Sequence, residues 1–276
     1  MNILEAILLG VIQGVTEFLP ISSSGHLEVL PRLFGWGTPS TVFMIMLHVG
    51  TFMAILIYFR KKIFLYFQAL INFLNKKADK SKNELRIILR ILVATIPAGI
   101  LGYLLEKPLV DFYDNNLDNK LIFLLEAIPM IVIGIVFIVE KKWTKHHEKK
   151  IEEIKINNAL VIGFAQALAF IRGVSRSGVT IISGRLVGLS RAEAAEFSFL
   201  MSIPILVVTS LYGFIILGGH NVSIEIAPII VGTMFSFLSG YFSIAFLISF
   251  LKRNSLAAFG IYRVIFGAIL ILLFLF

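Results

Sequence analysis

The sequence predicts an all-α integral membrane protein: six transmembrane helices plus two re-entrant helix–loop–helix hairpins, arranged as an inverted-topology repeat. The first observation is composition, because the 276 residues are 58% hydrophobic and 15% charged, with a mean hydropathy of +0.90. Soluble domains of this size are not so apolar. The second is a polar stretch at residues 13–26 that interrupts an apolar region. The third is its recurrence in the second half of the chain.

Charge and cysteine content exclude several classes of function. The net charge of +8 lies mostly in loops between apolar runs, so it indicates membrane topology rather than a nucleic-acid partner. With no cysteine, disulfide and thiolate chemistry are excluded and the redox compartment stays open. The N-terminal apolar run carries Glu5 and no basic cluster, which argues against a cleaved signal peptide.

The first half of the chain begins with two segments that are too short to span. Residues 2–19 form an apolar helix ending near Pro20, and residues 24–34 form a second short helix. A span needs about 20 apolar residues, so the two together are predicted as a re-entrant hairpin. A lysine-rich loop is expected at 75–86. Full spans are predicted at 41–60, 87–105 and 120–139.

The second half repeats this order after a charged connector. Residues 141–156 are charged throughout and are predicted to be a solvated cytoplasmic segment. Residues 157–172 and 178–189 form the second broken hairpin. Spans follow at 194–217, 226–250 and 257–275. The domain prediction is therefore a first repeat at 1–140, the connector at 141–156 and a second repeat at 157–276, within one membrane domain.

Two internal matches support the duplication. In the hairpins, five pairs align without a gap: Gly10 with Gly163, Gln13 with Gln166, Ser22 with Ser175, Ser24 with Ser177, and Gly25 with Gly178. Residues 93–103 also resemble residues 231–241. Because an odd number of spans follows each hairpin, the second repeat is inverted. Two broken helices at corresponding positions then meet near the bilayer midplane, where such proteins bind their ligands.

Charge placement sets the orientation of this topology. Nearly all loop lysines and arginines fall on one side, and the opposite side holds only Arg32, Lys107 and Lys120. The positive-inside rule makes the basic side cytoplasmic, so both termini lie outside and the first hairpin enters from outside. Arg185 and Arg191 are read as ordinary cytoplasmic charges that tolerate alanine.

Gln13 and Glu17 share one face of the first helix, since they are four residues apart. Their oxygens are candidates to hold a divalent cation, or Glu17 to move a proton. The alternative for Gln13 is helix packing, with Gly10 and Gly14 forming a small-xxx-small contact face. An unpaired carboxylate at membrane depth is expensive, which favours function for Glu17.

The serines at the two hairpin tips lie where short helices restart. Ser22, Ser23 and Ser24 suit a helix N-cap, but the same geometry binds anions through free backbone N–H groups. Ser175-Arg176-Ser177-Gly178 repeats the pattern with a guanidinium, which binds phosphate bidentately. Two facing tips would form one anion pocket. The alternative for Arg176 is a loop charge.

Other polar groups in apolar segments have several possible roles. His26 follows the serines and is a candidate to activate a hydroxyl, to act as nucleophile or to protonate a leaving group. His48 is expected to be a buried hydrogen-bonding group, and Arg172 a charge at the cytoplasmic mouth of the second hairpin. Further intramembrane candidates without an assigned role are Glu126, Glu196 and Arg263.

These motifs resemble those of the bacterial undecaprenyl-diphosphatase (bacitracin-resistance) family over essentially the whole chain. Residues 13–26, Gln-Gly-Val-Thr-Glu-Phe-Leu-Pro-Ile-Ser-Ser-Ser-Gly-His, are similar to its E/Q-x-x-x-E and P-x-S-S-x-G-H region. Residues 173–180 resemble its P-G-x-S-R-S-x-x-T motif, and residues 196–200 and 261–263 are also similar. One departure is Arg172, where the family usually has proline.

The resemblance implies hydrolysis of undecaprenyl diphosphate in a bacterial plasma membrane, at a site open to the extracytoplasmic face and dependent on a divalent cation, Mg or Ca. It implies four essential residues, namely Glu17, Ser23, His26 and Arg176. The expected substrate contacts are Ser22, Ser24, Gly25, Ser175, Ser177, Gly178 and Thr180, and the expected metal ligands are Gln13 and Glu17. Ser23 and His26 remain alternative nucleophiles, and a homodimer is possible.

Two other classes of protein share parts of this pattern. Inverted repeats with broken helices are also a transporter architecture, so a lipid-phosphate carrier is the alternative from another class. A lipid phosphatase of the acid-phosphatase type also carries S-G-H and S-R motifs, but it needs a histidine six residues after the arginine. That position is Ile182, which excludes it.

Overall fold

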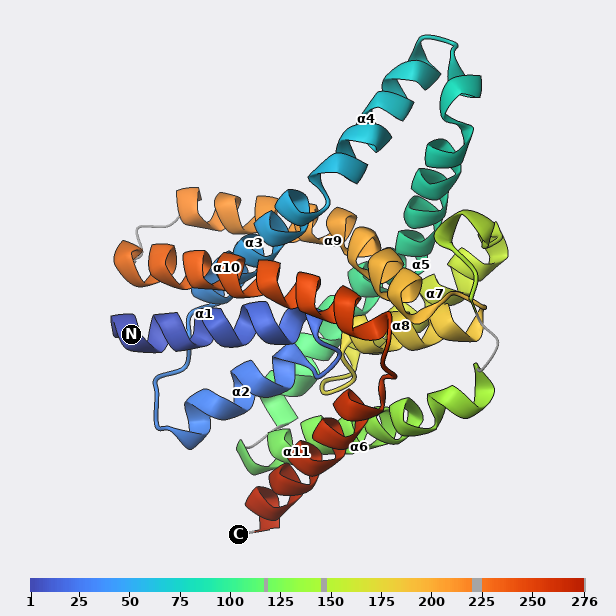
Figure 1. Cartoon of the computed structure of the whole chain (residues 1–276). Coiled ribbons are helices and arrows are strands. Elements are labelled where there is room, and N and C mark those ends of the chain that lie inside the picture. The colour runs from blue at the N-terminus through green and yellow to red at the C-terminus, as the bar shows by residue number, and fades with distance from the viewer. Residues whose placement is uncertain (117–118, 145–147, 220–224, 276) are drawn as a thin grey trace.

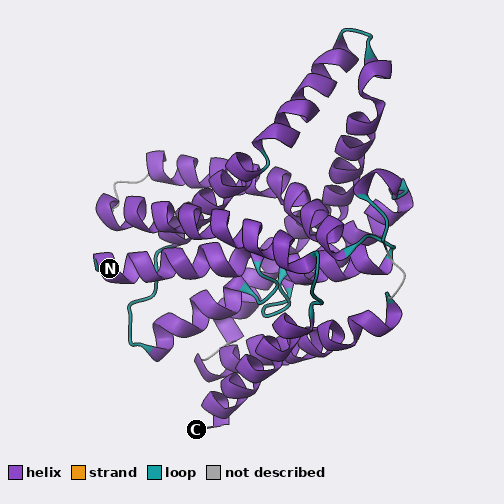
Figure 2. Cartoon of the chain, in the orientation of Figure 1, coloured by secondary structure: helices purple, strands orange, loops and turns teal. Residues whose placement is uncertain are grey.

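The protein is all-helical in a computed structural model that describes residues 1–116, 119–144, 148–219 and 225–275 (Figure 2). Within these residues there is no strand, only an isolated bridge between Lys149 and Leu189. The helices in chain order are α1 (Ile3–Phe18), α2 (Ser23–Leu33), α3 (Thr41–Tyr58), α4 (Arg60–Leu74), η1 (Ala78–Ser81), α5 (Lys82–Asn116), α6 (Asn119–Trp143), η2 (Ile151–Glu153), α7 (Ile156–Ala167), η3 (Leu168–Phe170), α8 (Arg176–Leu186), α9 (Arg191–Gly219), α10 (Ile226–Leu251) and α11 (Ala257–Leu275).

Six of these helices, α3, α5, α6, α9, α10 and α11, are long and apolar enough to cross a membrane. This confirms the predicted all-α class and the predicted number of spans. The four helices that flank the polar tips are shorter: α1 has 16 residues, α2 has 11, α7 has 12 and α8 has 11. At 1.5 Å per residue, even α1 is about 24 Å long, which is less than the roughly 30 Å hydrocarbon core.

Local sequence signals start and stop the first hairpin. The Asn2 side chain caps α1, and Glu5 completes a capping box by bonding back to the Asn2 backbone. Helix α1 ends at Phe18, shortly before Pro20, which has no N–H and disfavours helix in the residue before it. Helix α2 then restarts at Ser22, whose side chain is its N-cap.

Each short first helix of a hairpin packs on a long helix from the other half of the chain. Helix α1 lies against α10, and α7 lies against α5 (Figure 1). A Cβ at Gly10 would collide with the carbonyl of Gly232, and one at Gly163 would collide with the carbonyl of Ala94. The small-residue contact face expected on α1 is therefore present. Gly10 aligns with Gly163, and Gly232 with Ala94, so the two close contacts correspond in the internal matches.

The remaining long helices pair across the two halves as well. Helix α6 crosses α11 where Gly134 meets Gly260, and α3 packs between α9 and α10. The main core contains Phe18, Phe137, Phe197 and Phe199, all almost completely buried. Phe18, next to Glu17, contacts Phe199 edge to face at 5.2 Å. Glu17 is therefore adjacent in sequence to a side chain that is packed in the aromatic part of the core.

Helix α4 was not predicted. The span before it ends at Tyr58, as the basic residues 60–62 suggested, but the chain continues as a 15-residue amphipathic helix. Together with the start of α5 it forms an arm that extends from the bundle in Figure 1. Exposed aromatic side chains on α4 include Phe64, Phe67 and Phe73. Residues 63–74 are too few to cross a membrane, and for that reason no helix was predicted there.

The connector is not simply solvated, contrary to the prediction. Ile151 and Ile154 are buried in the main core, and Thr144 is fully buried. The Lys149 backbone bonds the 188–190 turn at both ends, donating to Gly188 at 3.0 Å and accepting from Ser190 at 3.0 Å. The Lys149 backbone therefore holds this segment to the turn after α8, and η2 contacts α5 and α9.

Candidate functional site

The two hairpin tips have almost identical geometry. Ser22 and Ser175 both lie in the left-handed region, at φ 74° and 73°. Each caps its helix by accepting a bond from a glycine N–H, at 3.3 Å from Gly25 and 3.2 Å from Gly178. Non-glycine residues in this region cost roughly 1–3 kcal/mol and cluster at functional sites. The N-cap interpretation of these serines is therefore correct, and it coexists with a strained backbone at both tips.

Glu17 joins the two tips. One carboxylate oxygen, Oε1, accepts from Nη2 of Arg176 at 2.8 Å, and Oε2 accepts from Ser23 Oγ at 3.0 Å. The Gln13 side-chain amide also donates to Oε2, at 3.2 Å. His48 Nε2 lies 3.9 Å from the same oxygen. The structure thus brings together Glu17, Ser23 and Arg176 from three different helices, with only 10% of the Glu17 side chain exposed.

This arrangement has the parts of a nucleophilic site. Ser23 Oγ is within hydrogen-bond reach of a carboxylate that can take its proton. Within the described residues, Arg176 donates to Glu17 and, in one long bond of 3.5 Å, to the Ser198 carbonyl, so donors of its planar fork remain for an anionic ligand. The first turns of α2 and α8 add free backbone N–H groups and positive dipole ends.

The predicted substrate contacts divide by exposure. Ser24 is exposed, whereas Ser23, Ser175 and Arg176 are partly exposed. Ser22, Ser177 and Thr180 are each at most 1% exposed. Thr180 donates to the Arg176 carbonyl at 2.8 Å and lies 2.6 Å from the Ser198 hydroxyl, so it holds the base of the second tip.

The glycines of the two tips allow close packing. Their amides are occupied by the serine caps described above. A Cβ at Gly25 would lie 3.1 Å from the Glu126 carboxylate, and one at Gly178 would lie 3.2 Å from the Phe137 ring. Both glycines therefore let α2 and α8 approach the helix beneath them.

The structure does not bring His26 into the Glu17 cluster. Its Nδ1 lies 2.7 Å from the Ser22 carbonyl and its Nε2 lies 2.6 Å from the Tyr262 hydroxyl. Because a carbonyl only accepts, Nδ1 carries the proton and Nε2 accepts from Tyr262. The ring is 5% exposed and stacks on Phe266 with centroids 4.5 Å apart. Both nitrogens are engaged in holding the first tip.

Some site residues were missed by sequence reasoning. His48 bonds the Met44 carbonyl at 2.8 Å, as expected of a structural histidine, but its other nitrogen faces Glu17. Its position within an apolar span was the available signal. Ser198 and Tyr262 lie in the stretches 196–200 and 261–263 that resemble the family, but neither was given a role, because their partners are distant in sequence.

The other intramembrane charges are mostly paired. Lys62 at the start of α4 forms an ion pair with Glu196. Arg172 pairs with Glu28 on α2 at 2.8 Å, so it links the hairpins rather than standing free at a mouth. Glu126 is fully buried, and neither carboxylate oxygen has a hydrogen-bond partner within the described residues.

The prediction that Arg185 and Arg191 are ordinary cytoplasmic charges is wrong for Arg185. It is 1% exposed and pairs with the fully buried Glu140 at 2.7 Å. Arg191, whose side chain is 20% exposed, reaches the other oxygen of Glu140 at 3.2 Å. Arg185 also donates to the carbonyl and hydroxyl of Thr144, at 2.7 and 2.9 Å. These bonds attach the C-terminal end of α8, which is the end farther from Arg176, to the end of α6.

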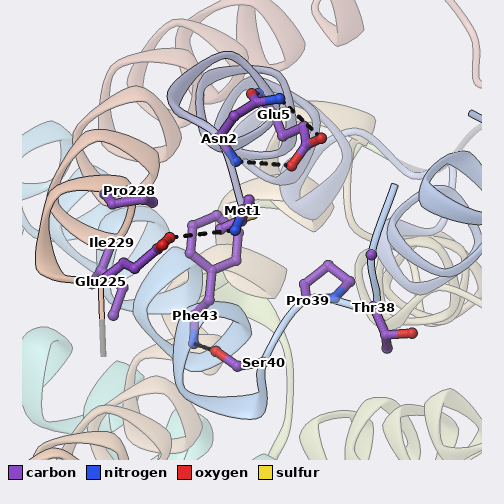
Figure 3. Close-up of a pocket in the computed structure, with 11 residues that line it drawn as sticks. Met1, Asn2, Glu5, Thr38, Pro39, Ser40, Phe43, Glu225, Pro228 and Ile229 are labelled. Atoms are coloured by element: carbon purple, nitrogen blue, oxygen red, sulfur yellow. Dashed lines mark hydrogen bonds and ion pairs between the residues drawn. The ribbon is translucent and has the colours of Figure 1, made fainter. Parts of the chain in front are cut away.

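A pocket of about 600 Å³ opens at the far end of α1 from Glu17 (Figure 3). It is lined by the start of α1, the loop before α3 and the start of α10, including Glu5, Ser40, Phe43 and Glu225. None of the predicted site residues lines it. It is a hollow at the end of the bundle where α1 begins, separate from the Glu17 cluster.

The donor set around Glu17 fits a divalent cation in part. Gln13 Oε1 is buried and has no hydrogen-bond partner, and it lies on the residue that touches Glu17. Across the described part of the chain, no group of three or more histidine, aspartate or glutamate residues could hold a metal. Two oxygens suit a cation that takes its other ligands from water and substrate phosphates, as Mg²⁺ commonly does.

The fold and this site define a class: a multi-pass helical membrane protein in which two helix tips meet around a carboxylate, a serine and an arginine. The family described as Bacitracin resistance protein BacA matches residues 6–269, so the chain belongs to that family. Similar proteins include undecaprenyl-diphosphatases of Trichlorobacter lovleyi (40% identical, 97% of this chain, 95% of the relative) and Myxococcus xanthus (38%, 99% and 89%). The resemblance found in the motifs is thereby confirmed.

Proposed function

We propose that this protein hydrolyses undecaprenyl diphosphate to undecaprenyl phosphate and inorganic phosphate, which recycles the lipid carrier of cell-wall synthesis and confers bacitracin resistance. Family membership over nearly the whole chain and relatives named as diphosphatases support an enzyme over the lipid-phosphate carrier. The observation that carries the proposal is the Glu17 carboxylate, which holds the Ser23 hydroxyl and the Arg176 guanidinium at once.

Ser23 is the nucleophile in this mechanism. Glu17 takes the Ser23 proton, and Oγ attacks the terminal phosphorus. The bond from that phosphorus to the bridging oxygen breaks, and the oxygen leaves as part of undecaprenyl phosphate. Undecaprenyl phosphate takes the proton from Glu17 as it leaves, so Glu17 can accept a proton from the water that attacks the phosphoserine. Glu17 passes this proton to Ser23 Oγ as the bond between Oγ and phosphorus breaks and inorganic phosphate departs. Arg176 and the first turns of α2 and α8 stabilise charge on the transferring group.

His26 supports the first tip rather than attacking phosphorus. A nucleophilic imidazole needs a free nitrogen lone pair, and Nε2 is engaged by Tyr262 at 2.6 Å. The Nδ1–H bond to the Ser22 carbonyl stabilises the left-handed turn that precedes Ser23. These contacts support Ser23 over His26 as the nucleophile.

A divalent cation, Mg or Ca, would be held by Gln13 Oε1 and Glu17. When bound, it would neutralise diphosphate charge and supply electrophilic assistance. Gln13 then orients Glu17 through its amide and offers its carbonyl oxygen to the cation.

We also propose that residues 1–140 and 157–276 are inverted repeats joined by 141–156, and that both hairpins are re-entrant. The matching tip geometries and the matching contacts Gly10–Gly232 and Gly163–Ala94 support this. The charge distribution supports a bacterial plasma membrane orientation with the first hairpin entering from the extracytoplasmic face. No step of the mechanism needs a homodimer.

The test of the activity is phosphate release from a polyprenyl diphosphate by the purified protein in detergent. Release that depends on Ser23 supports the diphosphatase. A carrier would move lipid phosphate between leaflets of proteoliposomes without releasing inorganic phosphate, and that result would overturn the proposal.

A further inference from the structure

Arg263 of α11 is a fully buried cation that the mechanism above does not use. Its side chain is 0% exposed, and with Arg185 it is one of the two largest fully buried side chains of the described residues. A guanidinium cannot lose its charge in a protein, so burying it at membrane depth is costly unless its donors are satisfied. Its partners therefore indicate what it does.

The partners of Arg263 are backbone carbonyls from both hairpin loops. Nη1 donates to the Pro20 carbonyl in the first loop at 3.2 Å. Nη2 donates to the carbonyls of Gly173 at 2.7 Å and Val174 at 3.1 Å, both in the second loop. Nε donates to the Met130 carbonyl of α6 at 3.2 Å. One planar group thus ties together the two loops and the helix beneath them.

The broken helices explain why such a group is needed. The chain leaves helical geometry between α1 and α2 and again before α8, so carbonyls there lack partners in their own helices. Irregular backbone at membrane depth persists only where protein satisfies it. A rigid fork with five donors can reach carbonyls on two separate loops, whereas a lysine ammonium bonds from a single point. The Phe137 ring, 5.7 Å from the guanidinium carbon, completes the enclosure.

We infer that Arg263 is a positioning residue that sets the register of Ser23 against Arg176, and this rests on the function proposed above. Ser23 follows the first loop and Arg176 follows the second. Pro20 is three residues before Ser23, and Val174 is two residues before Arg176. Other described bonds between the two hairpins are those of Glu17 with Arg176 and of Glu28 with Arg172, and a 3.5 Å bond from Ser177 Oγ to the Leu19 carbonyl. A misplacement of about 1 Å between reacting groups can lower a rate by about a hundredfold.

A stabilising residue without a positioning role would behave differently, and the chain contains a matched control. Arg185 is equally buried and also donates to backbone carbonyls, those of Leu189 and Thr144, at the opposite end of α8. Arg263→Lys and Arg185→Lys make the same chemical change. Both are expected to lower the thermal midpoint of the detergent-solubilised protein.

The kinetic parameters separate the two roles. Arg263→Lys should lower kcat by about tenfold or more and change KM by less than about threefold. Each tip should still bind phosphate, so KM changes little, but Ser23 and Arg176 are no longer correctly placed relative to each other in the transition state, so kcat falls. Arg185→Lys should leave kcat, per folded protein, within about twofold. The effects of Arg263→Lys and Arg176→Lys should be less than additive in the double variant, because they act on the same register.

Similar kcat values for Arg263→Lys and Arg185→Lys would overturn the inference, as would strict additivity with Arg176→Lys. If Arg263→Lys is not recovered folded, Arg263→Gln buries no charge and carries the same expectation for kcat and the same two outcomes. A wild-type protein that releases no phosphate, or an Arg176→Lys variant with wild-type kinetics, would instead count against the proposed function itself.

Discussion

Ser23 Oγ donates a hydrogen bond to Glu17 Oε2 at 3.0 Å across the turn that separates α1 from α2. Both residues belong to one hairpin, so this part of the site is local in sequence. Arg176, which binds the other oxygen of Glu17, lies 159 residues away on the second hairpin. The site is complete only when both hairpins are folded and in contact.

Ser23→Ala should lower phosphate release by about a thousandfold or more, because it removes the proposed nucleophile. The fold should persist, since Ser22 rather than Ser23 caps α2, and one lost hydrogen bond costs about 0.5–1.5 kcal/mol. The measurement is kcat together with the thermal midpoint in detergent. Ser40→Ala, which removes the N-cap of α3 beside the pocket at the far end of α1, is the control and should retain most activity. Near-normal turnover by Ser23→Ala would move the nucleophile to His26 or to water.

Arg176→Ala should lower kcat/KM by about a hundredfold or more, because several charge-assisted bonds to the transferring phosphoryl group are lost. Arg176→Lys keeps the charge but not the fork, so it should fall between alanine and wild type. Arg191→Ala is the suitable control, since Arg185 still pairs with Glu140 when Arg191 is removed. Equal effects at Arg176 and Arg191 would mean that the two tips do not form one site.

Patterns that are local or repeated were readable from the sequence. The polar residues at membrane depth located both tips, and the repeat predicted that the tip with Arg176 meets the first tip. The ion pair of Arg176 with Glu17 was not part of that prediction. The direction of individual side chains was not readable. His26 lies three residues after Ser23, but its ring contacts the Ser22 carbonyl, the Tyr262 hydroxyl and the Phe266 ring.

Burial of charge was the least predictable property. Arg185 lies in the last turn of α8, next to a short loop, which is typical of a solvated charge, but Glu140 of α6, 45 residues away in sequence, binds it. The role of Arg263 depends on the backbone carbonyls of Pro20, Gly173 and Val174, and a sequence motif does not show which distant side chain its carbonyls bind. Helix α4 was missed because its amphipathic pattern is shorter than a span.

His26→Gln should retain more activity than His26→Ala. If His26 only stabilises the first tip, a glutamine amide can still donate to the Ser22 carbonyl, whereas alanine cannot. We expect kcat for glutamine to exceed that for alanine by about tenfold, from one hydrogen bond worth about 1–1.5 kcal/mol. Tyr262→Phe should be mild, since His26 keeps its Nδ1 bond. If glutamine and alanine abolish turnover equally, imidazole chemistry is required after all.

The topology is testable by labelling, because the natural chain has no cysteine and each introduced thiol reports alone. Cysteines at Lys77 and Lys149 should label from the cytoplasmic side, and cysteines at Asn115 and His220 from the outside, as the positive-inside rule predicts. His220 lies outside the residues that the structure describes, so its place is a prediction from sequence alone. Labelling of Lys77 and Lys149 from opposite sides would contradict the inverted repeat.

The role of Gln13 in cation binding can be separated from helix packing by comparison with its aligned partner, Gln166. Both amides are buried with unpartnered atoms, but only Gln13 contacts Glu17. Gln13→Leu removes an oxygen ligand and should raise the Mg²⁺ concentration for half-maximal activity. Gln13→Glu adds a charged ligand and should lower that concentration, by about tenfold if the gain is near 1.4 kcal/mol.

Gln166→Leu is the control. It removes a buried amide that has no hydrogen-bond partner within the described residues, so the Mg²⁺ requirement should not change and the thermal midpoint should hold or rise. Titration of phosphate release against Mg²⁺ gives all three values, and the thermal midpoint with and without chelator gives a reading independent of turnover. If Gln13→Leu and Gln13→Glu both keep the wild-type Mg²⁺ dependence, Gln13 is a packing residue and the cation takes its ligands elsewhere.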